Sequence, residues 1–295
     1  MRRIAIVAAG GFGDALIFNS AALALKNKGV ETTLFSDSIG GFGKWLEGPF
    51  APQPGSSERF EGFDAVFLQH DNSLKARAIY NLPFPVFTFF GSHKVSKHGP
   101  LKEGRDFVAD PNQTMIENLK KALQLLFQIS CKELPSGLKP PPHLTYCRYP
   151  KRIVIHPLSA SKEKNWLKQR FLKVACWLEK EGFKPLFATP PEERLIWGGP
   201  SISSLETLAS LIYESGGFLG NDSGPGHIAS ALHIPHLILG QSEKHLRLWR
   251  PGWGQGAILT PPSWIPPLRL KEKCWKQLIT ENNVITSLKN SVLRY

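Results

Sequence analysis

The sequence of 295 residues contains little cysteine and few long apolar runs. Its four cysteines lie far apart, with no C-x-x-C pair among them: Cys131, Cys147, Cys176 and Cys274. This spacing fits neither a disulfide framework nor a zinc ribbon, and it favours a reducing compartment. After the first 26 residues, no segment reaches the roughly 20 consecutive apolar residues that a membrane-spanning helix needs. We therefore expect a cytoplasmic protein that is soluble or at most peripheral to a membrane.

Acidic residues are also in deficit, since 24 Asp and Glu stand against 36 Lys and Arg, a formal net charge of +12. This balance attracts polyanions such as nucleic acid, anionic lipid headgroups or phosphorylated sugars, and the charge alone does not choose among them. The composition otherwise suits a folded chain, with 42% hydrophobic residues to build a core. It excludes a disordered, collagen-like or coiled-coil protein. At about 150 residues per domain, the length suggests two domains.

The N-terminal segment shares some features with a signal peptide, because Arg2 and Arg3 precede an apolar stretch that runs to Leu25. Asp14 lies in the middle of this stretch, behind three glycines. A charge at that position would be expensive in a bilayer core. A buried strand, a tight turn and a helix are therefore expected here.

Short apolar runs alternate with helical patterns in both halves of the chain, which is typical of parallel sheets covered by helices. The expected strands are residues 4–9, 31–36, 64–70 and 85–90 in the first half and 152–158, 184–189, 216–221 and 236–240 in the second. Helices are expected near residues 168–182, 203–214 and 224–232. A further helical stretch follows Pro266 and closes the chain.

A proline-rich segment separates the two halves. Residues 134–151 hold five prolines and one glycine in eighteen positions, which disfavours both helix and strand and suits a linker. We therefore predict an α/β protein of two doubly wound domains, residues 1–140 and 141–295. The closing helix is expected to pack back on the first domain.

A glycine-rich turn is the first candidate functional motif. Gly10, Gly11 and Gly13 follow the first expected strand, and Asp14 follows them at the start of a helix. Glycines there allow a sharp turn and a close approach of a ligand to the backbone. A dinucleotide-binding fingerprint is disfavoured because its third glycine would fall on Leu16. Asp14 can accept a proton from a substrate hydroxyl at the sheet edge, or it can simply cap the helix.

The second motif is the loop of residues 156–166, which follows the first expected strand of the second half. Its hydroxyls and lysines suit phosphate binding, with Ser159 and Ser161 as donors and Lys162 or Lys164 as the neutralising charge. The alternative is an ordinary solvated polar loop.

The third motif, residues 220–232, runs from a strand end into a helix and is the most specific of the local patterns. Serine and glycine at the helix start leave free backbone N–H groups, which form an anion site. The alternative is a plain strand-turn-helix connection in which Asp222 or Ser223 caps the helix.

Two further patterns carry less weight. His227, His233 and His236 suggest a metal, but the last two flank a proline at the entry to a strand, so no metal site is predicted. Residues 245–253 interleave basic and aromatic side chains, as a surface that stacks nucleic acid does. This stretch is short and the other basic residues are dispersed, so a loop beside the ligand cleft is the preferred interpretation.

Taken together, these motifs resemble glycosyltransferase family nine, the heptosyltransferases of lipopolysaccharide core assembly, over nearly the whole chain. The matching elements are Gly13-Asp14, Asp71-Asn72-Ser73-Leu74-Lys75, Lys164-Asn165-Trp166, Leu205-Glu206 and Asp222-Ser223-Gly224-Pro225-Gly226-His227. The resemblance implies two facing Rossmann-like domains, the B-type glycosyltransferase (GT-B) fold. Residues 1–140 would bind the acceptor and residues 141–295 the nucleotide sugar.

The resemblance also implies roles for individual residues. Asp14 would be the general base on the acceptor hydroxyl, Lys164 would bind the donor diphosphate, and Glu206 would contact the nucleoside. The phosphate site would be lined by the following residues: Ser159, Ser161, Asp222, Ser223, Gly224 and His227. The family inverts the anomeric centre by direct displacement, without a metal or another cofactor, so base and leaving-group stabilisers lie on opposite sides of the sugar.

This sequence departs from the family pattern at two places and in its length. A proline common after the Gly-Asp turn is absent, and Gly240-Gln241-Ser242-Glu243 stands where Gly-Pro-Thr-Asp is expected. The chain is also shorter than usual, with the loss in its first half, so the resemblance constrains the donor more than the acceptor.

The expected function is transfer of a heptose or a related sugar from ADP-heptose or another ADP-sugar to an anionic lipopolysaccharide inner-core acceptor. Gly13, Lys75 and Arg77 are the expected acceptor-binding residues. Further basic residues lie in the loop after the next strand: His93, Lys94, Lys97 and His98. A monomer in peripheral contact with the inner membrane is expected, with no nucleic acid bound. The alternatives are a diverged or inactive relative using another nucleotide sugar, a nucleotide-sugar epimerase, and a basic nucleic-acid-binding protein.

Overall fold

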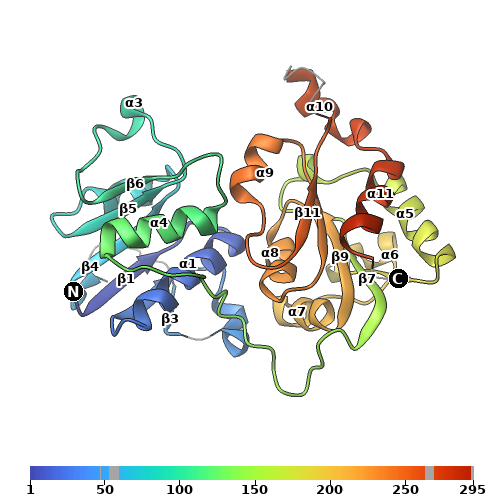
Figure 1. The fold of residues 1–295 in the computed structure, drawn as a ribbon, viewed down its shortest axis with the longest axis horizontal. Helices are drawn as coiled ribbons and strands as arrows, with labels where there is room; N and C mark the ends of the chain where they lie inside the picture. The colour runs from blue at the N-terminus through green and yellow to red at the C-terminus, as the bar shows by residue number, and fades with distance from the viewer. Residues whose placement is uncertain (47, 53–59, 263–268, 294–295) are drawn as a thin grey trace. The chain divides into compact units, whose positions relative to one another are not determined.

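The structure, a computed structural model, describes residues 1–46, 48–52, 60–262 and 269–293 (Figure 1). The chain folds as two compact units, Met1–Lys139 and Pro140–Tyr295. The division falls inside the proline-rich segment. Along the described ranges, every helix is too short or too polar to cross a bilayer.

Unit 1 is built on a parallel sheet in the order β3-β2-β1-β4-β5-β6. Its described strands are β1 (Arg3–Val7), β2 (Glu31–Phe35), β3 (Phe50–Ala51), β4 (Ala65–His70), β5 (Val86–Phe90) and β6 (Asp106–Val108). Its described helices are α1 (Phe12–Lys26), η1 (Gly40–Trp45), α2 (Leu74–Tyr80), α3 (Val95–His98) and α4 (Met115–Phe127). In β1, Ile4 pairs with Thr32 of β2 on one side and with Ala65 of β4 on the other. The strand order therefore reverses between β1 and β4, the place where open α/β sheets bind ligands.

Unit 2 repeats this plan with the order β11-β10-β9-β7-β8. The strands in its described part are β7 (Tyr149–His156), β8 (Lys184–Phe187), β9 (Ser215–Asn221), β10 (His236–Leu239) and β11 (Gly256–Leu259). Its helices there are η3 (Lys162–Lys164), α5 (Lys168–Lys180), η4 (Pro191–Glu193), α6 (Arg194–Trp197), α7 (Leu205–Tyr213), α8 (Gly224–Ala231), α9 (Glu243–Trp249), α10 (Arg269–Leu278) and α11 (Glu281–Ser291). The order reverses between β7 and β9, so the corresponding ligand edge lies at the carboxyl ends of these strands.

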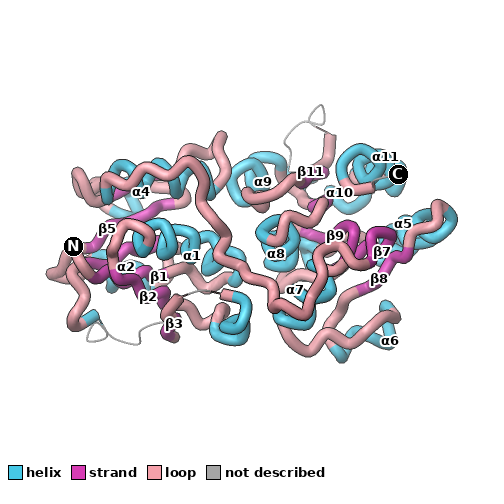
Figure 2. Tube along the Cα trace, turned by 60° about the horizontal axis from the view of Figure 1, so that its bottom comes forward, coloured by secondary structure: helices cyan, strands magenta, loops and turns pink. Residues whose placement is uncertain are grey.

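Helices cover both faces of each sheet, as Figures 1 and 2 show for unit 2, where α5 and α11 lie on one face and α7 and α8 on the other. The core under α5 and α11 includes the buried side chains of Trp166, Phe171, Trp275 and Leu288. In unit 1, the buried residues of α2 pack with those of β1, β4 and β5. Apolar contacts thus close these faces of the sheets, which suits the largely apolar central strands.

The eight strands expected from the sequence are found, each within three residues of its expected ends. The strands that the sequence analysis missed, β3, β6 and β11, are two to four residues long and lie at the edges of their sheets. The closing stretch is two helices rather than one, because Thr280 caps α11 in a capping box with Asn283. The buried Val284 and Leu288 of α11 join the core of unit 2, where α11 packs against α5, β10 and β11. Packing of the closing helix on the first domain stays a prediction.

Candidate functional site

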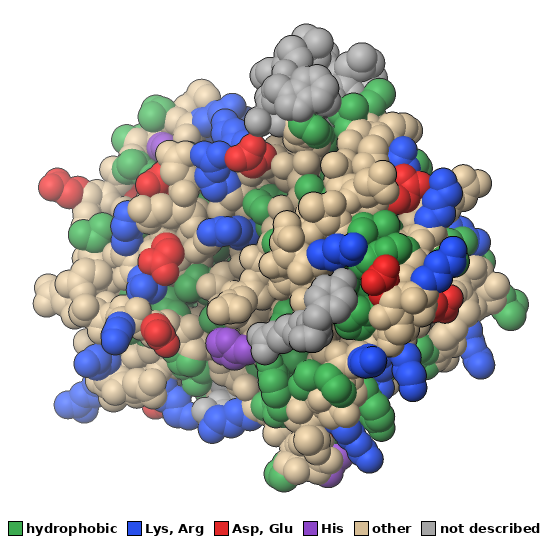
Figure 3. All heavy atoms as spheres, turned by 45° about the vertical axis from the view of Figure 1, so that its right-hand side comes forward, with side chains coloured by type: hydrophobic (Ala, Val, Ile, Leu, Met, Phe, Trp, Pro, Cys, Tyr) green, Lys and Arg blue, Asp and Glu red, His purple; other side chains and the backbone are tan. Residues whose placement is uncertain are grey.

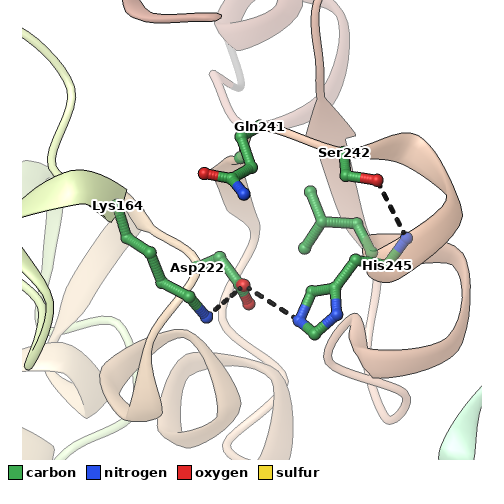
Figure 4. Close-up of a pocket in the computed structure, with 7 residues that line it drawn as sticks. Lys164, Asp222, Gln241, Ser242 and His245 are labelled. Carbon is green, nitrogen blue, oxygen red and sulfur yellow. Dashed lines mark hydrogen bonds and ion pairs between the residues drawn. The ribbon is translucent and has the colours of Figure 1, made fainter. Parts of the chain in front are cut away.

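A pocket lies at the carboxyl edge of the unit 2 sheet (Figure 4). It is lined by residues that follow β7, β9 and β10: Lys164, Asp222, Gly240, Gln241, Ser242, His245 and Leu246. These segments meet there because carboxyl ends of parallel strands share one edge of the sheet. Residues 245–249 belong to helix α9, so the expectation of a loop at this stretch was wrong. Ser242 starts the helix, since its Oγ accepts a hydrogen bond from His245 N.

Asp222 is the electrostatic centre of this pocket. Lys164 Nζ lies 3.0 Å from Asp222 Oδ2, and His245 Nε2 lies 3.5 Å from the same oxygen. Burial alone would raise the pKa of Asp222, but hydrogen bonds and charge from His245 and Lys164 outweigh it and lower the pKa. Only 13% of the Asp222 side chain is exposed, against 41% for Lys164 and 48% for His245. A buried carboxylate thus holds two half-exposed donors at the pocket, where they can meet an anion.

The loop that carries Lys164 is held in place by an asparagine at the end of β9. Asn221 Oδ1 accepts a hydrogen bond from Trp166 N at 3.0 Å, and its Nδ2 donates to Pro157 O at 2.7 Å. From the other side, the Trp275 indole donates to Glu163 O at 3.1 Å. These bonds hold the backbone on both sides of Lys164, so the lysine reaches Asp222 from an anchored loop.

The two serines of this loop have different surroundings. Ser159 Oγ lies 2.6 Å from Ser161 O and 2.7 Å from Asn165 Oδ1, so its proton is donated inside the loop. The carbonyl of the half-buried Ser161 also accepts a hydrogen bond from Lys164 N at 3.0 Å. Ser159 therefore shapes the loop in this structure, and phosphate contacts from the two serines stay a prediction.

Helix α8 begins beside Asp222. Ser223 is its N-cap residue and Gly224 its first residue, but Ser223 Oγ donates to Asn221 O instead of capping the helix. His227 lies one turn further, and burial lowers its pKa to about 4, only partly offset by the charge of Asp222. Its Nδ1 has no hydrogen-bond partner among the described residues. The buried neutral imidazole is therefore a hydrogen-bonding group and not a cation for phosphate.

The predicted nucleoside contact lies on a different helix. Glu206 is half-buried in the first turn of α7. Within the described part of unit 2, it is not among the residues that line the pocket. The contact with a nucleoside therefore stays a prediction.

Asp14 occupies the corresponding edge of unit 1. It is the third residue of α1, whose N-cap is Gly11, so it does not cap the helix. Gln69 at the end of β4 donates from Nε2 to Asp14 Oδ1, while Gln69 Oε1 accepts from Ala9 N at 2.9 Å. Burial raises the pKa of Asp14, and the bond from Gln69 offsets only part of that rise. The result is an oriented carboxylate with more than ordinary affinity for a proton.

Gly11 keeps the surroundings of Asp14 open. A Cβ on Gly11 would lie 2.5 Å from Asp14 Oδ2, so a side chain there would collide with the carboxylate. Gly13, a predicted acceptor-binding residue, is half-exposed immediately before Asp14. The glycine-rich turn thus leaves room around the carboxylate as well as bending the chain.

The predicted acceptor cations lie on α2, which Ser73 caps at the same sheet edge. Lys75 is half-buried and Arg77 is exposed. Residues that stand two positions apart in a helix are rotated by about 200° about its axis. The side chains of Lys75 and Arg77 therefore point in different directions. A joint clamp of Lys75 and Arg77 on one anionic group therefore requires their long side chains to bend toward each other.

Three histidines cluster near α2. The His98 ring centre lies 5.2 Å from that of His70 and 5.0 Å from that of His93. Burial lowers the pKa of both His70 and His98, and a neighbouring ring adds to the effect in each case. Among the residues that the structure describes, no group of His, Cys, Asp or Glu has the arrangement of a metal site. The cluster therefore adds hydrogen-bonding groups to this edge more than positive charge.

The sequence analysis missed three residues of these sites: Gln69, Asn221 and His245. The first two are polar residues that end otherwise apolar strands, a pattern that marks a ligand edge in parallel sheets. His245 stands two residues after the expected position of the Gly-Pro-Thr-Asp variant, and the basic and aromatic pattern of residues 245–253 did not assign it to the pocket.

The comparisons with known proteins agree with this description. Lipopolysaccharide heptosyltransferase 3 of Escherichia coli K12 is 29% identical over 121 residues, which are 36% of this chain and 35% of that protein. The match thus spans about a third of the curated relative. The fold is shared with E. coli ADP-heptose lps heptosyltransferase II (TM-score 0.69, 15% identity, 98% of both chains covered).

A glycosyltransferase family 9 structure from Veillonella parvula matches at a TM-score of 0.68, with 17% identity over 98% of this chain and 96% of that one. E. coli heptosyltransferase WaaC with ADP-2-deoxy-2-fluoro heptose matches at 0.69, with 15% identity over 98% and 99% of the two chains. The predicted GT-B class, with a Rossmann-like sheet in each unit, is thereby confirmed. The model of glycosyltransferase family 9 (heptosyltransferase) matches residues 60–251, more than half of the sequence. The chain therefore belongs to glycosyltransferase family 9.

Proposed function

We propose that this protein transfers a heptose, or a related sugar, from an ADP-activated donor to an anionic lipopolysaccharide inner-core acceptor, with inversion at the anomeric carbon. One observation supports the proposed donor site. The half-exposed Lys164 ammonium lies 3.0 Å from Asp222 in a pocket at the switch point of unit 2. A rigidly placed cation at such an edge suits a diphosphate. The solved E. coli WaaC with an ADP-heptose analogue supports the choice of nucleotide.

In the proposed reaction, unit 2 stabilises the leaving group. Lys164 neutralises the charge that develops on the diphosphate as the bond to the sugar breaks. Ser223 and Gly224 at the start of α8 would add hydrogen bonds to the phosphates, and the buried His227 would support them from behind. Glu206 would contact the nucleoside, as the family resemblance implies. As the family resemblance implies, the proposed direct displacement proceeds without a metal.

Asp14 supplies the other half of the reaction as the general base on the acceptor hydroxyl. Its raised pKa makes it a better proton acceptor than an ordinary carboxylate, and the Gln69 amide fixes its orientation. Gly13, Lys75 and Arg77 would hold the acceptor near it. Because the acceptor is anionic, the net charge of +12 favours its approach at a membrane surface. A cytoplasmic monomer in peripheral contact with the inner membrane is part of this proposal.

A thermal-shift screen of nucleotides tests the donor. ADP and ADP-sugars should raise the melting temperature more than UDP, GDP or NAD, since a ligand at about 100 times its dissociation constant adds about 2.7 kcal/mol. A larger shift with another nucleotide would identify a different donor sugar nucleotide. The absence of any shift with nucleotides would reject the donor site itself.

Nucleic-acid binding is the weaker alternative. In Figure 3, Lys and Arg side chains are scattered over the face shown, among acidic and apolar ones, and do not form a continuous stripe. Within α9, Arg247 is paired with Glu243 at 2.7 Å, so part of the basic stretch is neutralised locally. A nucleic-acid groove needs aligned cations and stacking rings.

A further inference from the structure

One oxygen of Asp222 serves two donors. Lys164 Nζ at 3.0 Å and His245 Nε2 at 3.5 Å both point to Asp222 Oδ2, as the close-up shows (Figure 4). The carboxylate is much less exposed than either partner. Its negative charge therefore depends on these side chains for compensation, and little of it is hydrated by solvent.

The proposed function requires Lys164 to interact with the donor diphosphate as well as with Asp222. To bind the donor diphosphate, Lys164 must share or give up its bond to Asp222. A buried carboxylate that loses its only partner is strongly destabilising, because neither water nor another cation replaces the lost interaction. With Lys164 alone as partner, diphosphate binding would thus be opposed by the cost of leaving Asp222 unpaired.

His245 is placed to remove that cost. Helix α9 is anchored by the buried Leu246 and Leu248, and Ser242 caps it at His245 N. The His245 ring also stacks on Trp249 one turn later, with ring centres 6.2 Å apart. The imidazole is therefore held beside Asp222 by its own helix, independently of Lys164.

We propose that His245 is a positioning residue: it keeps Asp222 paired when Lys164 turns to the donor diphosphate. This inference rests on the proposed donor role of Lys164 and names a residue outside the motifs that carry the family resemblance. The charged groups near His245 are Asp222 and Lys164 in the pocket and, on its own helix, Lys244 and the Glu243–Arg247 pair.

Titration calorimetry with ADP tests the proposal as a double-mutant cycle. His245→Ala should weaken ADP binding about tenfold, as expected for loss of a hydrogen bond to a charged group. His245→Gln, whose amide still donates to Asp222, should stay within about threefold of the unmodified protein. With Asp222→Asn as background, His245→Ala should change the affinity less than about twofold, because no buried charge then needs a partner.

Two results would overturn the proposal. An equal loss in both backgrounds would show that His245 touches the donor directly, and unchanged affinity in His245→Ala would show that it has no role. Lys244→Ala removes a positive charge from the same helix, outside the pocket lining, and is the matched control. If it weakened ADP as much as His245→Ala does, the general charge of α9 would be the cause.

A second part of the experiment, thermal denaturation of the variants, needs no ligand. Lys164→Ala and His245→Ala should each lower the melting temperature slightly, and the double variant should lose several degrees more than the sum, because Asp222 then loses both partners. Additive losses would contradict the proposal. If the unmodified protein binds no ADP, the proposed donor is wrong, and this part still decides whether His245 can replace Lys164 at Asp222.

Discussion

Each unit places a buried carboxylate after a strand that adjoins the switch point of its sheet, yet the two acids behave in opposite ways. Asp14 follows β1 in unit 1. Burial raises the pKa of Asp14, and its side-chain partner, the neutral amide of Gln69, offsets only part of that rise. Asp222 follows β9 in unit 2, where burial is outweighed by Lys164 and His245, so its pKa is lowered. The partner, and not the depth of burial, therefore decides whether such an acid takes up a proton or stays ionised to hold a cation.

The largest expected effect concerns the proton-accepting side of this comparison. Asp14→Asn should reduce turnover about 100-fold to 10,000-fold, because the amide keeps the size of the side chain but cannot accept a proton. ADP binding should stay nearly unchanged, since Asp14 belongs to unit 1. Rates of sugar transfer and calorimetric ADP affinity measure the two separately. Turnover within a few-fold of the unmodified protein would leave Asp14 with a purely structural role.

A substitution of Lys164 in unit 2 should have the opposite pattern of effects, with its main effect on ADP binding. Lys164→Ala should weaken ADP binding by about 1.5 to 3 kcal/mol, the usual contribution of a charge-assisted hydrogen bond. Lys162→Ala is the control, because that exposed lysine lies two residues earlier in the same loop and outside the pocket lining. Should Lys162→Ala weaken ADP while Lys164→Ala does not, the loop would meet the donor through the other lysine.

How far these sites follow from the sequence differs between residues. Asp14 and Lys164 were predicted because each lies in a loop after a recognisable strand, and the family motifs include both. Gln69, Asn221 and His245 were not, because their roles arise from contacts with residues 55, 55 and 23 positions away. A hydrogen-bond partner that distant is determined by the packing of strands, which a single sequence does not display.

The same physics limited the fold prediction. Long, apolar central strands such as β4 and β7 were found, whereas β3 and β6 at the sheet edge have two and three residues. Helix α9 was taken for a loop because its basic and aromatic residues hid the start signal at Ser242. Short elements at edges depend on their neighbours more than on their own pattern.

The opposite pKa shifts predict opposite effects on stability. At neutral pH, ionisation of the buried Asp14 lowers the free energy of unfolding. This loss of stability disappears as the pH falls through the raised pKa of Asp14 and the side chain takes up a proton. Ionised Asp222 contributes stability above the ordinary value of 3.8, and this is lost as pH falls through its lowered pKa. At pH 7, Asp14→Asn should therefore raise the melting temperature and Asp222→Asn should lower it, each by a few degrees. Thermal denaturation repeated at pH 4 should show the Asp14→Asn difference reduced, whereas the Asp222→Asn difference should be largely kept until the pH falls below 3.8. Shifts of the same sign at pH 7 would contradict the comparison.

The smallest expected effect is a difference in salt dependence between the proposed anion sites of the two units. Lys164 is tied to a buried carboxylate, whereas Arg77 is exposed and Lys75 is half-buried. Salt screens exposed charges much more than partly buried ones, so acceptor binding should depend on ionic strength more than ADP binding does. Replacing Lys75 and Arg77 together by Ala should raise the acceptor Michaelis constant several-fold and flatten its salt dependence, with ADP affinity unchanged.

The single variants sharpen this last prediction, because the two side chains leave α2 in directions about 200° apart. If both contact one anionic group, each single variant should give part of the effect. If only one faces the acceptor, its variant alone should reproduce the double variant and the other should behave as the unmodified protein does. A Michaelis constant and salt slope unchanged in the double variant would place the acceptor elsewhere and leave the charge of +12 to general attraction to anionic surfaces.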